Sequence, residues 1–186
     1  MLKESDIFCG PKEREIRHGV ISVMVTGDKI YMVCHKESEK TPEGSWGLPS
    51  ETITVLSDNK GKLQRETVIS AWRRGFHEEL NFNLAAIHTT CLAPNYNYFF
   101  NLKTGLPFDP DARGIVTVSH IENEELLPIG LIDSPEISFA CFMTIDDVIN
   151  GDYVARPSPN PRDVIGGLKY GGVFDRMGKD KQWKRR

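Results

Sequence analysis

Two adjacent carboxylates lie close to an arginine in the stretch RRGFHEELNF, which contains Arg74, Glu78 and Glu79. Carboxylate oxygens are the ligands that hard divalent cations such as Mg2+ prefer, so these residues could hold a metal ion. On a helix, Arg74 can reach Glu78 four residues later, whereas the two glutamates project about 100° apart. The ordinary alternative is a solvated helix face with a surface ion pair worth a few tenths of a kcal/mol. For two adjacent glutamates taken alone, this alternative is the commoner one.

The residues around this stretch follow a characteristic spacing. Glu66 precedes Arg74 with seven residues between them, and apolar Phe76, the glutamate pair and apolar Phe82 follow. This pattern resembles the Nudix box, written G-x5-E-x7-R-E-U-x-E-E-x-G-U, in which U is bulky and apolar. The upstream residues 46–49, WGLP, also resemble the sequence that often leads into that box. We therefore interpret the segment from Glu66 to Phe82 as a divergent Nudix box.

Three positions depart from the family pattern. Gly75 stands where the box has a glutamate after the arginine, Asn81 replaces the closing glycine, and Ser50-Glu51 replace a glycine pair after Leu-Pro. Asparagine also serves as a helix C-cap, so Asn81 is the mildest of these changes. Gly75 removes one oxygen ligand, which water or another acidic side chain could replace in the octahedral shell of Mg2+.

The resemblance implies a Mg2+- or Mn2+-dependent hydrolase that cleaves the diphosphate linkage of a nucleoside diphosphate joined to another moiety. It implies catalytic roles for Glu66, Arg74 and Glu78, and metal binding by Glu78 and Glu79. Arg74 would orient Glu66 and Glu78, and all three glutamates would lie near the start or on the exposed face of one helix. The family places its general base variably, and the candidates here are Glu122, Glu124, Glu125 and Glu136, although each is more commonly solvated surface.

Two other functions are compatible with the sequence. The first is a catalytically impaired Nudix-like module that lost turnover through Gly75 and binds a nucleotide-derived ligand. The second is an RNA-processing relative that uses the basic tail KDKQWKRR. The formal net charge of −3 gives no net attraction to nucleic acid, so a nucleic-acid partner is not expected. The expected partner is a small-molecule nucleotide substrate, and a homodimer is compatible with the sequence.

Weaker features outside the box have ordinary explanations. The aromatic segment 96–100 could stack a nucleobase, but it is more typical of a sheet core. Arg113 and Arg156 could bind a substrate phosphate, although exposure without function is the commoner case. The run GGLKYGG at 166–172 could approach phosphates, but it lacks the P-loop ending and predicts turns. His77, inside the predicted helix, is expected to be exposed.

The candidate site depends on one helix. Apolar residues recur at intervals of three and four after Thr67, whose hydroxyl can cap the helix by accepting a bond from a first-turn amide. Asn81 tolerates the left-handed conformation that ends a helix, so the helix is predicted to end there. Its apolar stripe is predicted to consist of Ile69, Trp72, Phe76 and Leu80.

Strands are predicted on both sides of this helix. A β-hairpin turns at Gly27-Asp28, a short strand covers Thr52–Leu56, and an insertion follows at 57–65 because the box spacing is too long there. Strand-like runs return at 114–121 and 137–145, and a short helix begins near Asp146. This order predicts an α/β protein with a mixed β-sheet covered by helices, and the resemblance implies the Nudix α/β/α sandwich.

The length of 186 residues favours one domain. We expect an N-terminal arm at 1–16, a Nudix-like domain at 17–150, and a C-terminal extension at 151–186 that packs on or trails the same domain. The four cysteines are widely spaced without a CxxC pair, which favours neither a zinc site nor a disulfide framework. With no basic-then-apolar leader and no long apolar run, a cytoplasmic protein without a membrane partner is expected.

Overall fold

The computed structural model describes residues 17–38, 41–57, 63–82, 91–92, 112–157 and 159–179. The N-terminal arm 1–16, the aromatic segment 96–100 and most of the basic tail lie outside these residues, so those expectations stay predictions.

Eight strands form one mixed sheet within the described residues, and its main path runs β7-β8-β1-β2-β10-β9. The strands of this path are β1 (Arg17–Thr26), β2 (Lys29–His35), β7 (Cys91–Leu92), β8 (Ala112–His120), β9 (Gly130–Leu131) and β10 (Ile137–Thr144). Two short strands join it from the side: β3 (Trp46–Gly47) pairs with β2, and β4 (Ser50–Thr52) pairs with β1. β1 and β8 are parallel, whereas the other pairs are antiparallel. The predicted mixed sheet is therefore confirmed.

The hairpin predicted at Gly27-Asp28 connects β1 to β2. Thr26 pairs with Lys29, so two residues make the turn. Gly27 has φ of 58°, in the left-handed region where a glycine carries no Cβ penalty. The glycine thus permits the tight reversal that brings the first two long strands together, and the prediction is confirmed.

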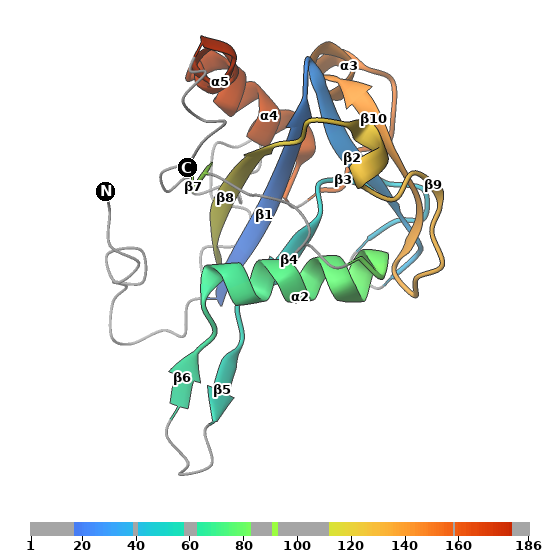
Figure 1. Cartoon of the computed structure of the whole chain (residues 1–186). Helices are drawn as coiled ribbons and strands as arrows, with labels where there is room; N and C mark the ends of the chain where they lie inside the picture. The colour runs from blue at the N-terminus through green and yellow to red at the C-terminus, as the bar shows by residue number, and fades with distance from the viewer. Residues whose placement is uncertain are drawn as a thin grey trace.

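The strand predicted over Thr52–Leu56 is wrong in its continuity. The chain leaves β4 at Thr52 and enters β5 (Val55–Ser57), which pairs with β6 (Leu63–Arg65) in a separate two-stranded ribbon. The two residues in between serve other contacts, because Ile53 is buried and the Thr54 side chain bonds to Glu66. The described ends of the insertion expected at 57–65, residue 57 and residues 63–65, thus lie in this ribbon, which projects below the main sheet in Figure 1.

Helices cover both faces of the sheet (Figure 1). Along β1, Val20 and Met24 join one core cluster with residues of α2 (Val68–Leu80), whereas Ile21 and Val23 join a second cluster with α3 (Ile145–Asn150) and α4 (Pro161–Tyr170). Alternate residues of a strand point to opposite faces, so α2 lies on one face and α3 with α4 on the other. The expected α/β/α sandwich is confirmed. A short helix, α5 (Val173–Lys179), and a 3-10 turn, η2 (Glu124–Leu126), complete the described elements.

Helix α2 begins and ends as predicted, but its apolar stripe is displaced by one residue at the start. Thr67 accepts a hydrogen bond from the Ser70 amide, and Asn81 takes the left-handed conformation with φ of 51°. Val68 is 2% exposed whereas Ile69 is 52% exposed, so Ile69 does not belong to the stripe. The error matters because a stripe that starts at Val68 also brings Glu79 to the buried side, 11 residues or about three turns later.

The glycine-rich run at 166–172 is mostly helical, so the predicted turns are wrong for residues 166–170. Asn160 caps α4 by accepting a bond from the Arg162 amide, and Pro161 occupies the first turn, where its missing N–H costs nothing. Burial of Val164, Ile165 and Leu168 against the sheet offsets the poor helix propensity of the glycines. The helix ends at the Gly171-Gly172 pair.

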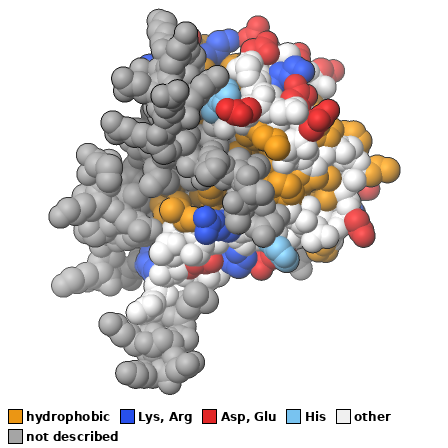
Figure 2. Space-filling view, viewed as in Figure 1, with side chains coloured by type: hydrophobic (Ala, Val, Ile, Leu, Met, Phe, Trp, Pro, Cys, Tyr) orange, Lys and Arg blue, Asp and Glu red, His pale blue; other side chains and the backbone are white. Residues whose placement is uncertain are grey.

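The surface of the described residues mixes both signs of charge. On the face in Figure 2, acidic and basic side chains are interspersed around exposed hydrophobic ones. No helix in this part of the chain is long and apolar enough to cross a membrane. Cys34 and Cys141 are both free thiols, and the side chains of Cys9 and Cys91 lie outside the described residues.

Candidate functional site

Arg74 is the centre of a polar network that joins α2 to the strand before it. Its Nε and Nη2 donate to the two carboxylate oxygens of Glu66 at 3.2 and 3.0 Å, a two-point contact of the kind that fixes both side chains. Nη2 also donates to the Thr52 carbonyl at 2.7 Å, and Nη1 donates to Glu78 at 3.0 Å. The hydrogen bond with Glu66 is the main cause that raises the pKa of Arg74, which therefore stays charged.

Glu66 lies just before α2 and is buried. Besides Arg74, it accepts hydrogen bonds from the Thr54 hydroxyl at 2.9 Å and the Thr54 amide at 3.3 Å. Burial raises the pKa of Glu66, but the hydrogen bonds from Arg74 and Thr54 outweigh it and lower the pKa below its ordinary value. Glu66 is thus an ionised carboxylate whose oxygens both accept hydrogen bonds within the protein. These bonds hold Arg74 and the end of the ribbon in place.

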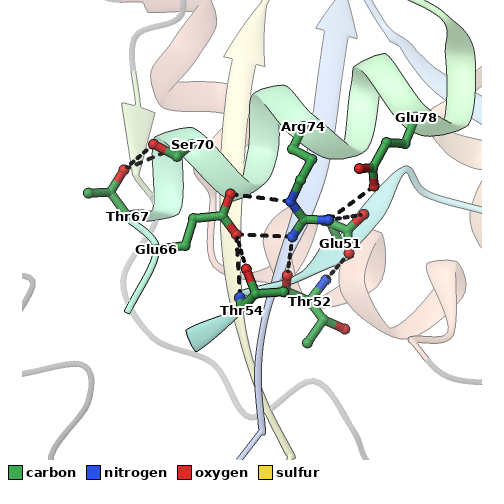
Figure 3. A network of polar contacts seen from close by, with 8 residues as sticks. All are labelled: Glu51, Thr52, Thr54, Glu66, Thr67, Ser70, Arg74 and Glu78. Atoms are coloured by element: carbon green, nitrogen blue, oxygen red, sulfur yellow. Dashed lines mark hydrogen bonds and ion pairs between the residues drawn. The ribbon is translucent and has the colours of Figure 1, made fainter. Parts of the chain in front are cut away.

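A third carboxylate that the sequence reasoning did not select, Glu51, enters the same network from β4. Its Oε2 lies 3.2 Å from Arg74 Nη1, and its Oε1 accepts a hydrogen bond from the Thr52 amide at 2.6 Å. In Figure 3, Glu66, Glu51 and Glu78 all point toward the Arg74 guanidinium, from the segment before α2, from β4 and from α2. Partial burial raises the pKa of Glu51, against the effects of Thr52 and Arg74. The sequence showed Glu51 only as a departure from a glycine pair.

Gly75 faces Glu51 across the contact between α2 and β4. A Cβ built on Gly75 would lie 2.7 Å from the Cβ and 3.2 Å from the Cγ of Glu51, closer than carbon atoms approach. No side chain fits at position 75 while Glu51 keeps its place. The glycine in the middle of the helix is therefore explained by the carboxylate that packs against it.

The adjacent glutamates of the box occupy opposite environments. The Glu78 side chain is 57% exposed, whereas Glu79 is 5% exposed. The expectation that Glu79 lies near the helix start or on its exposed face is therefore wrong, because the core-facing side of α2 includes position 79. Its Oε2 is buried and has no hydrogen-bond partner among the residues that the structure describes. An unpartnered buried carboxylate oxygen is costly unless a proton or a cation covers it.

The electrostatic neighbours of Glu79 come from three other parts of the chain. The pKa of Glu79 is raised to about 8, mainly by burial and also by the charges of Glu136 and Glu51, whereas Arg156 and a backbone hydrogen bond from Ser50 act in the opposite direction. Burial therefore favours the protonated, neutral form of this carboxyl. A positive charge placed at its free oxygen would favour the carboxylate.

Arg156 lies beside this buried carboxyl, which the sequence did not predict. Its Nη1 donates to the Ser50 hydroxyl at 2.8 Å, and its backbone amide donates to the Trp46 carbonyl at 2.8 Å. Burial lowers the pKa of Arg156, and the neighbouring acids, Glu79 foremost, oppose that change. The expectation that Arg156 is simply exposed is wrong. The signal lies in tertiary structure, since only the pairing of residues 154–156 with β3 brings this arginine to α2.

His35 completes the buried polar group. It is buried at the end of β2, and no described residue bonds to its Nε2. Burial together with the nearby Arg156 charge lowers its pKa to about 3. A Cβ on Gly47 would lie 2.9 Å from that Nε2 and 3.2 Å from Arg156 Cδ. Gly47, the glycine of WGLP, therefore leaves room for a neutral histidine next to a charged arginine.

Comparison with known proteins bears on this arrangement. No family model and no curated protein matches the sequence. Among solved structures, a MutT protein from Methanosarcina mazei Go1 is similar with a TM-score of 0.57 at 15% identity, over 91% of this chain and 100% of that chain. The Nudix domain of Shewanella oneidensis NrtR, solved with ADP ribose, is similar with a TM-score of 0.51 at 16% identity, over 91% of this chain and 99% of that chain.

The chain has the Nudix fold. A third similar structure is a bifunctional NMN adenylyltransferase/ADP ribose pyrophosphatase from Francisella tularensis, solved with AMP and a manganese ion. Its TM-score is 0.56 at 18% identity, and the match covers 90% of this chain but 45% of that chain.

The four glutamates considered as general base fall into two groups, according to whether their contacts bring them to the site. Glu124 forms an ion pair with Lys29 at the start of β2, at 2.8 Å. The site lies at the other end of that strand, about 20 Å away at about 3.3 Å per residue, so Glu124 and its neighbours in η2 are not brought to it. The backbone of Glu136, in contrast, accepts a bond from Lys36 next to His35, and its charge acts on Glu79. Glu136 is the only one of the four candidates that these contacts bring to the site.

The side chain of Arg113 lies outside the described side chains, and His77 is exposed in the last turn of α2, as predicted. Among the residues that the structure describes, no three of His, Cys, Asp or Glu are gathered at distances that would hold a metal ion. The donor types nevertheless suit a hard cation, because carboxylates surround this part of the fold and Glu79 has an oxygen that nothing in the described chain covers.

Proposed function

We propose that this protein is a Nudix-type pyrophosphohydrolase that uses Mg2+ or Mn2+ to cleave the diphosphate linkage of a nucleoside diphosphate joined to another moiety. The observation that carries the proposal is the buried Glu79, whose Oε2 has no partner in the described part of the chain although the carboxyl is almost fully removed from water. A bound cation would offset the cost of burying this carboxylate oxygen. The arrangement fits the box register, in which Glu79 is the second glutamate of the pair.

Glu78 and Glu79 would hold the cation, one from the solvent side and one from the core side of α2. Arg74 would act as a positioning residue, because it holds Glu78 through Nη1 while Glu66 fixes it through Nε and Nη2. When bound, a divalent cation would neutralise negative charge on the diphosphate and orient it for attack. In the reaction, water attacks one phosphorus, the bridging P–O bond breaks, and the products are a nucleotide and a phosphorylated moiety.

Two residues of the chain would contribute to this reaction, one through its positive charge and one as a general base. Arg156 brings a positive charge beside Glu79 and could attract the anionic diphosphate. Glu136, exposed and close enough to act electrostatically on Glu79, is the best placed candidate for the base that takes a proton from the attacking water. The proposed substrate class is supported by two similar structures, which contain ADP ribose in one case and AMP with manganese in the other.

A second candidate function is a ligand-binding module without turnover. It is favoured by the closed packing at Gly75, where no carboxylate can stand while Glu51 is in place, and by Arg74, which engages Glu51, Glu66 and Glu78 at once. Such a module would bind a nucleotide-derived ligand without producing a new compound. For both candidate functions we propose that the partner is a small molecule and not a nucleic acid, and that the protein is cytoplasmic.

The test is an assay of the purified protein with Mg2+ or Mn2+ against ADP-ribose, dinucleoside polyphosphates, nucleotide sugars and nucleoside triphosphates. Hydrolysis of at least one compound is expected, and Glu79→Gln should reduce the rate by at least a hundredfold. Glu43→Gln, at an exposed loop position, is the matched control and should leave the rate unchanged. Saturable binding of a compound, without hydrolysis of any compound tested, would reject the hydrolase and support the binding module.

A further inference from the structure

We propose that one end of the main sheet, on the face opposite α2, is a docking surface for a basic amphipathic helix of a partner protein. The surface is a row of four side chains on neighbouring strands: Leu131 of β9, Phe139 of β10, Cys34 of β2 and Trp46 of β3. We call this row the edge strip. The inference is independent of the proposed hydrolysis, because α2 and its acids lie on the other face of the sheet.

The four side chains form one row because their strands are in register. Leu131 is paired with Phe139, and Phe139 with Cys34. Cys34 is paired in turn with Trp46. Residues paired across neighbouring strands point to the same face of a sheet, and Trp46 packs against the core cluster of α3 and α4, so this face is the one opposite α2. Neighbouring strands lie about 4.8 Å apart, so the row is about 14 Å long.

The edge strip is exposed although it is apolar. Leu131 is 88% exposed and Phe139 is 37% exposed, whereas Cys34 and Trp46 are half-buried. The rings of Phe139 and Trp46 come from strands on either side of β2, yet their centroids are 6.2 Å apart at an angle of 74°. The two rings therefore lean toward each other above Cys34 and make the strip continuous. Contiguous apolar surface, unlike a single exposed side chain, is typical of a contact site.

The helices on this face cover only the opposite end of the strands. The amide of Ile145, the first residue of α3, donates to the Asp28 carbonyl in the turn between β1 and β2. β2 runs away from that turn and β10 runs back toward it, so the edge strip lies at their far end. In Figure 1, α3, α4 and α5 accordingly lie above β3 and β9.

A helix is the element that suits the edge strip. Sheet faces in α/β proteins are covered by helices, so a helix across the strip would continue the layer that α3 and α4 begin. A row of about 14 Å corresponds to about ten residues of helix at a rise of 1.5 Å per residue. Apolar side chains on one face of such a helix would cover Leu131 and Phe139.

The charge beside the edge strip selects a basic partner. Three connections meet at this end of the sheet, since Lys36 bonds through its amide to Glu136 and the His35 amide bonds to Ser45. The exposed acids of these connections, described at residues 36–38, 41–45 and 132–136, are Glu37, Glu43, Asp133 and Glu136. Within the same described residues the basic side chain is Lys36, whose Nζ donates to the Ser134 carbonyl at 2.6 Å. An acidic rim of this kind attracts a basic helix and repels nucleic acid and anionic membranes.

A second copy of this chain does not suit the same surface. A symmetric contact between two copies would bring two identical acidic rims together, and like charges that face each other across an interface cost free energy. A helix with lysine or arginine beside its apolar face complements both the strip and its rim. We therefore assign the edge strip to a basic helix of another protein.

The test uses a fluorescent synthetic helix of about fourteen residues, made of leucine and lysine with the leucines on one face. Binding is measured by fluorescence anisotropy at about 0.15 M salt. The wild-type protein should bind this peptide saturably, and a matched peptide with glutamate in place of lysine should bind at least tenfold more weakly. Leu131→Ser should weaken binding at least fivefold, whereas Tyr170→Ser, at a 91% exposed position of α4, should stay within twofold.

A second pair of variants tests the rim. Glu37→Gln/Asp133→Asn should weaken binding of the leucine-lysine peptide at least threefold. The matched control Glu122→Gln/Glu125→Gln removes two exposed acids away from the strip and should stay within twofold. Equal weakening by both double variants would show that net charge alone attracts the peptide, and would overturn the inference.

A measurement on the unmodified protein guards against misfolding of the variants. The peptide should shift the nuclear magnetic resonance signals of the Leu131 methyl groups and the Trp46 indole, and leave those of Ile69, an exposed residue of α2, in place. Equal affinity for the lysine and glutamate peptides, unchanged affinity in Leu131→Ser, or no saturable binding would overturn the inference.

Two other occupants of the edge strip give distinct results. If removal of residues 180–186 raised the peptide affinity at least tenfold, the basic tail of the chain would be the occupant and the inference would be overturned. Dimerisation of the unliganded protein that Leu131→Ser abolished would assign the strip to a second copy instead. A monomer whose peptide affinity is unchanged by removal of the tail would support a separate partner helix.

Discussion

The close contact between Gly75 and Glu51 makes a prediction about stability that opposes the usual behaviour of helices. In an unobstructed helix interior, Gly→Ala stabilises by about 1 kcal/mol. Here the added methyl would lie 2.7 Å from the Cβ and 3.2 Å from the Cγ of Glu51, both of which are close to the backbone and cannot swing away freely. Overpacking of this kind typically costs about 1–3 kcal/mol. Gly75→Ala is therefore expected to destabilise the protein by about 1–2 kcal/mol.

Two backgrounds locate the cause. In Glu51→Ala the Cβ remains, so Gly75→Ala should still destabilise. In Glu51→Gly the Cβ is gone, so the same change should now stabilise by about 1 kcal/mol, as helix propensity requires. Urea unfolding with unchanged m-values measures each difference as a free energy of unfolding. If Gly75→Ala stabilised the wild-type chain, or if the Ala and Gly backgrounds behaved alike, the packing argument would be refuted.

Two further changes test the rest of the polar core. Because the pKa of buried His35 is lowered to about 3, the unfolded chain binds the proton first as pH falls, so stability should be lost from about pH 6.5 down to about pH 3. Unfolding measured across this pH range should show a loss on the order of 4 kcal/mol in the wild type, and His35→Gln should greatly reduce that loss. Equal pH profiles of stability for the wild type and His35→Gln would contradict this prediction. Arg74→Lys cannot reproduce the two-point contact with buried Glu66, so it should cost about 1–3 kcal/mol in thermal or urea unfolding, and a change below about 0.3 kcal/mol would count against the network.

The sequence contained enough to predict the elements that local chemistry determines. Thr67 and Asn81 were correctly predicted to bound α2, because a hydroxyl cap and a residue tolerant of the left-handed conformation are local requirements. The hairpin at Gly27 followed from the same kind of reasoning. The mixed sheet and its helical layers followed from the order of strand-like and helix-like segments and from the resemblance of the box.

The errors arose where burial overrides local pattern. Ile69 was assigned to the core in place of Val68, and a buried Glu79 runs against the rule that unpaired acids stay in water, so neither could be read from periodicity. Arg156 reaches the site through pairing with β3, a contact more than a hundred residues apart in sequence. Glu51 was visible in the sequence, but its meaning depends on its distance from Gly75, which only the fold supplies.

The ribbon of β5 and β6 has a practical consequence for engineering. Its base is clamped on both sides, since the Glu66 amide donates to the Thr54 carbonyl at 2.9 Å and the Thr54 hydroxyl donates back to the Glu66 carboxylate. Because the entropy of closing a loop grows only slowly with its length, an epitope or fluorophore tag grafted beyond this clamp adds little strain. The ribbon thus offers a handle for labelling or immobilising the protein while the arginine and its acids stay in register.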